Sequence, residues 1–322
     1  MLCLCICNQI LSQNALNRFF TPADTLHKIR FYSLVGTGAV MVGGALIALN
    51  SVWYAEYQQS KFQLFNDWKE WEQMDKGGHL LTAYQTSRWA YEGATWTGVN
   101  RKKAVWTGVA VATLFQGGLE ILDGFSAKWG FSLGDVAFNE LGCALFAAQE
   151  LVWHEQRIVP KASFSYPQYP DVLIPSADGT QTTRLSNRID HLLGQKSLPQ
   201  RFFKDYNGQT IWLCANISSF LPRENKVPKW LNLAIGYGAE GMYGGFGNSW
   251  TDKNGVRYDV TNNQLFPRYR QFYLSLDVDL SRIKTKNRLL KTLFSAVRFL
   301  KFPAPTLEFN SLGKVRFIPI FY

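Results

Sequence analysis

The sequence predicts an α+β protein in which an N-terminal bundle of about four helices is followed by a β-rich, antiparallel C-terminal region that carries a basic amphipathic helix. Three observations support this fold class. Hydrophobic residues make up 47% of the 322 residues, which is enough for a core and excludes wholesale disorder. Apolar stretches of helical length, joined by short polar connections, occupy residues 29–158. Alternation of apolar and polar residues, typical of strands, dominates residues 209–322.

The first of the four helices carries the strongest membrane signal in the chain. No charged residue occurs between Arg30 and Glu56, and the apolar stretch from Leu34 to Trp53 is long enough to cross a bilayer. Aromatic residues at 53–57 are typical of a membrane interface. The alternative is a fully buried core helix, and we favour the membrane-spanning helix.

Three further helices are predicted at 75–91, 102–122 and 132–156. Asp75 would place a negative charge at the positive N-terminus of the first, and Ser132 is a suitable N-cap for the third. The charge-free centres of the last two are too short for a full span, so they suit either a shallow membrane bundle or a water-soluble one. The short connections predict that neighbouring helices are antiparallel.

The first 14 residues resemble an export signal. An apolar run from Leu2 to Ile6 is followed by small and polar residues, as at the end of such a signal, although no Lys or Arg precedes the run. The alternative is a frayed apolar N-terminus. Three of the five cysteines lie in this segment, while Cys143 and Cys214 fall in different halves of the chain, so we expect no disulfide between them.

The second half begins with a change of composition. Over residues 271–280, large apolar residues alternate with polar ones, which predicts a half-buried strand. Similar alternation occurs at 211–217 and 231–239, and a hairpin loop is expected at 310–313. Residues 159–208 are expected to form a linker or an irregular wrapping segment, because they are rich in serine, threonine and proline, namely Pro160, Pro167, Pro170 and Pro175.

The excess of positive charge lies entirely in the second half. Residues 1–160 hold 12 Lys+Arg and 13 Asp+Glu, whereas residues 161–322 hold 22 and 11. The partners that suit such a surface are anionic membrane lipids and envelope glycans. We expect no nucleic-acid partner, because the chain has no zinc-finger spacing, no RNP-like aromatic motif and no basic-zipper heptads.

One basic segment, residues 281–301, interrupts the predicted strands. Leu, Phe and Val recur in it at helical spacing, which predicts a basic amphipathic helix on an anionic bilayer surface. The alternative is an ordinary surface helix packed on the sheet with solvated charges, and the apolar stripe suits both equally. The candidate lipid-contacting residues are Arg282, Lys284, Lys286, Arg288 and Lys291.

Polar residues at the ends of the predicted helices form a candidate site. Asp75 and a histidine four residues later share one helix face. About nine residues join the end of the second of the three helices to the start of the third, so those two ends should lie close together. The candidate residues are His79, Glu120, Asp123, Asp135 and Asn139.

This set offers three carboxylates, an imidazole and an amide. Carboxylates held together raise one another's pKa, and a neighbouring histidine is kept protonated. Such a cluster can perform acid–base chemistry or hold a divalent cation. The alternative is structural, because buried polar groups often satisfy one another and fix helix register, and no nucleophile with its base is evident. In either case His79 should lie within ion-pairing reach of at least one of the three carboxylates, since isolated buried charges are costly.

The same residues resemble the VanZ-like pattern. Residues 75–79 match its D-K-x-x-H start, Glu120 is the expected carboxylate on the next helix, and Asp135, Asn139 and Gly142 match D-x-x-x-N-x-x-G. The chain is more closely similar to the YfiM-type family of predicted periplasmic lipoproteins, in its long, Bacteroidetes-like form, and this resemblance extends over most of the sequence. It implies a location in the cell envelope and no established activity.

Two classes of function follow. The first is a structural or scaffolding protein of the cell envelope, membrane-associated and facing the periplasm, in contact with lipids and other envelope components. The second is an enzyme that acts on an envelope lipid or its head group through the histidine and carboxylate cluster. The sequence identifies no cofactor and no metal. A convergent pocket at the helix ends would favour the enzyme, and a shielded, mutually satisfied cluster would favour the structural protein.

Overall fold

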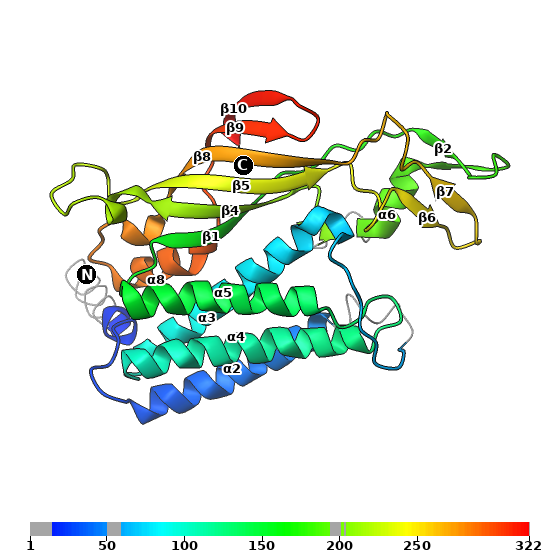
Figure 1. The fold of residues 1–322 in the computed structure, drawn as a ribbon. Coiled ribbons are helices and arrows are strands. Elements are labelled where there is room, and N and C mark those ends of the chain that lie inside the picture. The colour runs from blue at the N-terminus through cyan, green and yellow to red at the C-terminus, as the bar shows by residue number, and fades with distance from the viewer. Residues whose placement is uncertain (1–14, 50–58, 194–200, 203, 322) are drawn as a thin grey trace, which may run out of the picture.

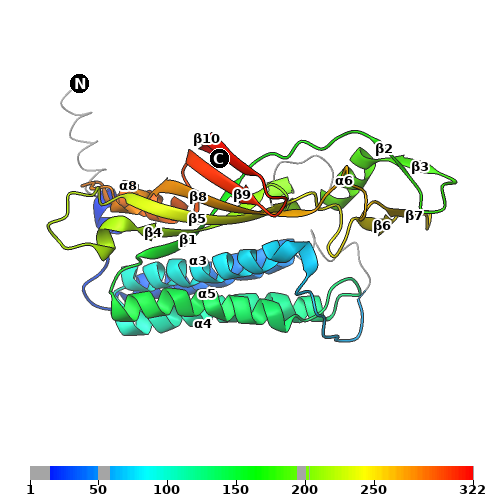
Figure 2. The same ribbon diagram turned by 45° about the horizontal axis from the view of Figure 1, so that its top comes forward.

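The computed structural model describes residues 15–49, 59–193, 201–202 and 204–321 (Figure 1). The export signal expected at 1–14 and the aromatic cluster at 53–57 lie outside these residues. A layer of long helices lies beneath a sheet, and a smaller lobe of short strands projects beyond one end of that sheet (Figures 1 and 2). The predicted α+β class is therefore confirmed.

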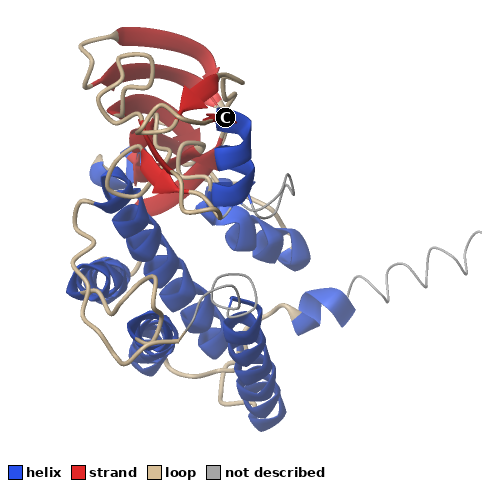
Figure 3. Cartoon of the chain, turned by 90° about the vertical axis from the view of Figure 1, so that its right-hand side faces the viewer, coloured by secondary structure: helices blue, strands red, loops and turns tan. Residues whose placement is uncertain are grey.

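Four long helices dominate the first half, as predicted. The central one contacts the two helices that follow it and also the sheet, whereas the first lies at the edge of the layer (Figure 3). A short 3-10 turn, η2 (Glu70–Gln73), precedes the central helix. The four are α2 (Lys28–Leu49), α3 (Met74–Trp96), α4 (Arg101–Gly124) and α5 (Leu133–Val152).

Local sequence explains where these helices begin and how closely they pack. The side chain of Asn100 caps α4, and the side chain of Ser132 caps α5, as its sequence position predicted. Gly108 of α4 and Gly142 of α5 both lie directly against backbone carbonyl groups of α3, where a Cβ atom would overlap the oxygen. Glycine at these two positions therefore lets the three backbones approach one another closely.

Six antiparallel strands form the main sheet, in the order β1-β4-β5-β8-β9-β10. The last two form the hairpin predicted around residues 310–313, where Gly313 takes a positive φ of 76° that suits glycine. The strands are β1 (Ile158–Phe164), β4 (Gln209–Asn216), β5 (Leu231–Glu240), β8 (Tyr269–Val278), β9 (Ala304–Asn310) and β10 (Val315–Phe321).

The segment 159–208, expected to be irregular, contributes to both the sheet and the lobe. It holds most of β1, and Pro160 is tolerated there because β1 is an edge strand, where a missing N–H removes no bond from the centre of the sheet. The lobe has its own apolar core around Leu185 and Tyr258. Its elements are β2 (Leu173–Pro175), β3 (Thr182–Arg184), α6 (Leu185–Leu193), β6 (Ser249–Thr251) and β7 (Arg257–Asp259).

The main sheet buries many polar side chains on one face and exposes apolar side chains on the other, which is unusual. One face is buried and largely polar, with side chains such as Asn232, Asp277 and Glu308. The other face carries large apolar side chains that are 37–66% exposed, and α3 covers only a part of it, where Gly77 lies against Ile211. We call the uncovered part the apolar sheet face; it consists of Leu213, Leu233, Ile235, Phe272, Leu274, Leu276, Leu307, Phe309, Val315 and Phe317.

Candidate functional site

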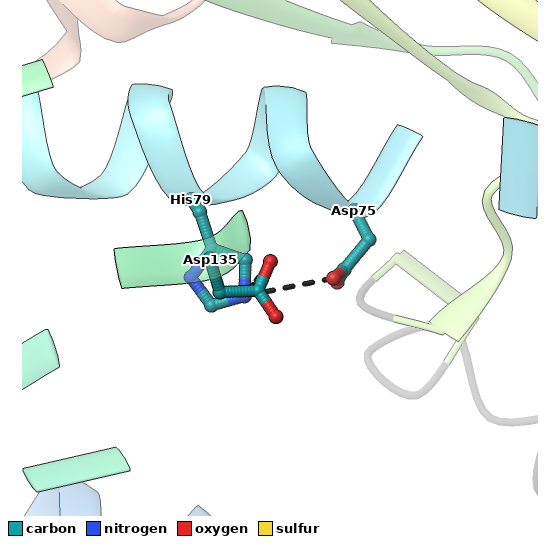
Figure 4. A group of neighbouring side chains, drawn as sticks. All are labelled: Asp75, His79 and Asp135. Carbon is teal, nitrogen blue, oxygen red and sulfur yellow. Dashed lines mark ion pairs between the residues drawn. The ribbon is translucent and has the colours of Figure 1, made fainter. Parts of the chain in front are cut away.

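The candidate site lies at one end of the helical layer, where three helix ends meet. Asp75 and His79 come from the first turns of α3, Glu120 from the last turn of α4, and Asp135 from the first turn of α5. Figure 4 shows the imidazole of α3 beside the carboxylate of α5, with the Asp75 carboxylate on the same side of α3. The antiparallel order of the helices brings these ends together.

His79 is the centre of the arrangement. Its Nε2 lies 3.6 Å from Asp75 Oδ2 and 3.5 Å from Asp135 Oδ1. On its other side, Nδ1 lies 3.6 Å from Glu120 Oε1 and 3.1 Å from Asn139 Oδ1. The predicted proximity of His79 to a carboxylate is therefore confirmed.

Asp123, the remaining candidate, stands one helical turn after Glu120 at the end of α4 and is half-buried. Its negative charge helps to raise the pKa of Glu120. It thus acts on the cluster through its charge.

Lys76 is a member of the cluster that sequence reasoning did not select. Its ammonium Nζ lies 2.5 Å from Asp135 Oδ1 and 2.8 Å from Asp67 Oδ1, and the side chain is only 1% exposed. Asp67 lies before α3 and is also buried. The available signal for Lys76 was its place between Asp75 and His79 in the VanZ-like pattern, whereas nothing in the sequence pointed to Asp67.

A second layer of hydrogen bonds holds these groups in place. Gln116 Nε2 donates to Asn139 Oδ1 at 2.8 Å. The Ser132 hydroxyl donates to Asp67 Oδ1 at 2.6 Å while it accepts from the backbone N–H of Asp135. Tyr206, from the second half of the chain, donates its hydroxyl to Asp75 Oδ1 at 2.7 Å. The β-rich half thus contacts the cluster directly.

The chain enters α3 through an unusual turn beside the cluster. Residues 71–73 all have positive φ, between 50° and 63°, although none is glycine. Left-handed backbone costs roughly 1–2 kcal/mol for each such residue. The turn is held by Arg268 and Arg270, which contact the two oxygens of the Glu72 carboxylate at 3.2 and 3.0 Å. Structure elsewhere in the fold therefore fixes the position of the first turn of α3.

Burial shifts the pKa of several carboxyl groups in the cluster. Desolvation raises the pKa of Asp135 to about 9, with the nearby Asp75 charge adding to the shift. Desolvation likewise raises the pKa of Glu120 to about 8, and it raises that of Glu70, in the turn before α3, to about 7. For Asp67, burial acts in the same direction, but hydrogen bonds from Asp135, Lys76 and Ser132 outweigh it and lower the pKa.

The cluster therefore contains carboxyl groups whose pKa values are shifted in opposite directions. At neutral pH a protonated Asp135 beside an ionised Asp67 is an acid and base pair of the kind found in catalytic sites, and also in structural networks. Asp75, His79 and Asp135 also offer one nitrogen and two oxygens that lie within 4.8 Å of one another, a donor set that divalent metals accept. The Lys76 ammonium already supplies a positive charge at this place, which lowers the need for a metal ion.

The basic segment 281–301 differs in part from its prediction. Its helix, α8, extends only over Arg288–Ala296. Arg282 lies before it and forms ion pairs with Glu155 and Asp279 at 3.3 and 3.4 Å. The predicted basic amphipathic helix is therefore present but shorter than the segment, because other basic residues of the segment serve the core: Arg298 is buried against Asp279.

Four of the five candidate lipid-contacting residues are exposed. Lys284 and Lys286 lie before α8, and Arg288 and Lys291 lie in its first turn. The short 3-10 turns η4 (Leu280–Arg282) and η5 (Val297–Phe299) flank this stretch on either side. A compact basic surface thus remains, which is smaller than the one expected from the sequence.

Comparison with known proteins identifies one relationship. Residues 64–150 match the model of a family described as predicted periplasmic lipoprotein (DUF2279). This range holds α3, α4 and most of α5, and with them His79 and the carboxyl groups around it, whereas Tyr206 lies outside it. Searches of curated proteins and of solved structures each gave no match. The match confirms the predicted location in the cell envelope, associated with a membrane and facing the periplasm.

Proposed function

We propose that this envelope protein is a structural or scaffolding protein anchored by α2, which contacts lipid through that helix and through the basic surface beside α8. The observation that carries the proposal is the exposure of α2. The helix has 22 residues, no charge after Arg30, and no buried residue. The YfiM-type resemblance supports the envelope location that this proposal requires.

The dimensions and surroundings of α2 suit a membrane anchor. At 1.5 Å per residue it is about 33 Å long, which matches the roughly 30 Å hydrocarbon thickness of a bilayer. Its glycines, such as Gly43 and Gly44, face open space, and its side chains at Val40 and Met41 are about three-quarters exposed. In water this much apolar surface would be unfavourable, since hydrophobic surface is stabilised only when it is covered.

The other long apolar helix, α4, has a different role in this proposal. In the most apolar stretch of α4, 28% of the residues are buried, whereas no residue of the corresponding stretch of α2 is buried. It packs against α3 and α5, and it carries Glu120 of the cluster. We therefore place α2 in the membrane and α4 in the bundle.

The basic surface can add electrostatic attraction to the anchor. Lys284, Lys286, Arg288 and Lys291 are all exposed, and each basic residue near an anionic membrane contributes about 1 kcal/mol of attraction. The backbone N–H of Arg288 donates to the side chain of Asn17, which lies shortly before α2. The basic surface therefore lies beside the segment that leads into the proposed anchor.

The anchor can be tested by placing charge in α2. The double variant Val40→Asp, Ile47→Asp changes two exposed positions of α2, and a charge at the helix centre, near Val40, costs about 2.5–3.5 kcal/mol on insertion. We expect most of the protein to leave the carbonate-washed membrane fraction. Lys253→Asp, in an exposed turn of the lobe, is the matched control and should stay with the membrane. Retention of the α2 variant at the wild-type level would contradict the proposal.

The second candidate function is an enzyme that acts on an envelope lipid or its head group. It is favoured by one observation, the position of His79 within 3.6 Å of two carboxyl groups, Glu120 and Asp135, whose pKa values are raised to about 8 and about 9. The test is to incubate the protein in vesicles made from envelope lipids and to search for converted lipid by mass spectrometry. Conversion that disappears in both His79→Ala and Asp135→Asn would support the enzyme, and identical lipid profiles with and without the protein would exclude it.

A further inference from the structure

We propose that the apolar sheet face contacts the hydrocarbon of a bilayer, so that the protein meets lipid with its main sheet as well as with α2. This inference rests on the membrane association stated above and goes beyond it, because that association involves α2 and the basic surface beside α8 and assigns no lipid contact to the strands of the sheet. It depends on the arrangement of side chains across neighbouring strands.

The register of the sheet aligns apolar side chains in rows. In the central row, Leu213 of β4 pairs with Ile235 of β5, which pairs with Leu274 of β8, which in turn pairs with Leu307 of β9. All four side chains are between 37% and 55% exposed. Because paired residues in a sheet lie on the same face, this row is a continuous apolar stripe across four strands.

The opposite face of the same strands is buried and rich in polar side chains, which surround a small apolar cluster that includes Trp212 and Tyr273. Asp277 of β8 forms an ion pair of 2.7 Å with Lys161 of β1, and both side chains are at most 1% exposed. Asn232 of β5 donates to Asp277 at 2.9 Å. A sheet in water turns its apolar face to the core and its polar face to solvent. Here the order is reversed, as in strands that face lipid on one side and polar groups on the other.

The size of the exposed face sets it apart from a soluble surface. Ten large side chains at these exposures offer on the order of 800 Å² of apolar area, since one aromatic side chain alone presents about 150–250 Å². Typical soluble monomers have a largest apolar patch of about 300–600 Å². All ten members of the face are apolar.

The length of the strands and the residues at one end of the sheet indicate that a bilayer covers the apolar sheet face. Strand β8 has ten residues and is about 33 Å long, close to the thickness of the hydrocarbon region. The exposed Trp230 stands at one end of the sheet, together with exposed Lys226 and Lys229 in the loop before β5. Trp at the interface and Lys beyond it are the residues that flank lipid-facing segments next to anionic head groups.

Photo-crosslinking in the full-length protein tests the contact. Phe272→p-benzoylphenylalanine and Phe309→p-benzoylphenylalanine each replace one exposed aromatic ring of the face by another. Leu265→p-benzoylphenylalanine, at a loop position that is 80% exposed, is the control outside the face, and Met41→p-benzoylphenylalanine reports on α2. The proteins are reconstituted in vesicles of phosphatidylethanolamine and phosphatidylglycerol with radiolabelled acyl chains.

We expect at least tenfold more labelled lipid on the two sheet positions than on position 265. Lipid on position 41 but not on 272 and 309 would overturn this inference and leave the anchor intact. Lipid on 272 and 309 but not on 41 would support the sheet contact and refute the anchor. Crosslinks from 272 or 309 to a second copy of the chain, in place of lipid, would assign the face to a protein interface and overturn the inference.

Discussion

Replacing Lys76 with Met should destabilise the protein more than other single changes in the cluster. Lys76 is 1% exposed, and its Nζ lies 2.5 Å from Asp135 Oδ1 and 2.8 Å from Asp67 Oδ1. Met keeps an unbranched side chain of similar length and removes the ammonium group, so the change isolates the charge. Removal of one partner from a buried ion pair costs about 3–5 kcal/mol, because the other charge is left unpaired.

The protonation states of Asp135 and Asp67 narrow the expected loss of stability. Asp135, with a pKa of about 9, is largely neutral at pH 7.5, so the charge left unpaired at short distance is that of Asp67. We therefore expect a loss near the lower end, about 3–4 kcal/mol in the free energy of unfolding. Denaturant unfolding of the detergent-solubilised protein measures it. Lys69→Met, an exposed lysine seven residues away, is the matched control and should change stability by at most about 0.5 kcal/mol.

The loss of stability in Lys76→Met should also depend on pH. The pKa of Asp67 is lowered in the folded protein, so its contribution to stability is present above the unfolded pKa of about 3.9 and is lost as the pH falls through the folded value. The deficit of Lys76→Met should therefore persist from pH 7.5 down to about pH 4 and shrink only below that pH. Asp67→Asn should reduce the cost of the lysine change when the two are combined. A loss below about 1 kcal/mol at pH 7.5, or full additivity with Asp67→Asn, would refute the ion-pair reasoning.

Two further predictions concern the other groups. His79→Ala should lower the free energy of unfolding by roughly 1–3 kcal/mol if the cluster is structural, since it leaves the buried Glu120 carboxyl group without its imidazole partner; normal stability combined with loss of an envelope phenotype would instead indicate function. The basic surface should bind anionic vesicles with an affinity that falls as salt rises. The double variant Lys284→Glu, Lys286→Glu should weaken that binding severalfold in flotation assays, and equal binding to neutral and anionic vesicles would contradict the electrostatic explanation.

The helical half was largely predictable because its signals are local. Caps, charge-free stretches and short connections fix where helices begin and how they alternate, so the sequence alone identifies Ser132 as the N-cap of α5. The 3.6-residue period also places Asp75 and His79 on one face. These rules depend only on neighbouring residues, so the sequence determined them without knowledge of the tertiary fold.

The cluster was predictable only in part, for a physical reason. The histidine and the carboxylates at helix ends stand out because charged groups in apolar surroundings need partners. Lys76 did not stand out, because a lysine in the first turn of a helix is ordinarily exposed. Tyr206 and Asp67 reach the site from segments outside the three helices, through contacts that no local pattern encodes.

The sheet shows a different limit of prediction from sequence, which concerns the side of a strand that is buried. Alternation with a period of two predicts that one side of a strand is buried, but it is symmetric and does not say which side. In water the apolar side is the buried one, and β8 would turn Leu274 inward and Ser275 outward. In the structure Leu274 is 41% exposed and Ser275 is 4% exposed. The same alternation thus supports opposite orientations in water and in lipid, and only the interior partners of β8 decide between them. The ion pair of Asp277 with Lys161 makes the polar side of β8 the interior one. The apolar side then faces outward, which suits the lipid contact that we propose for it.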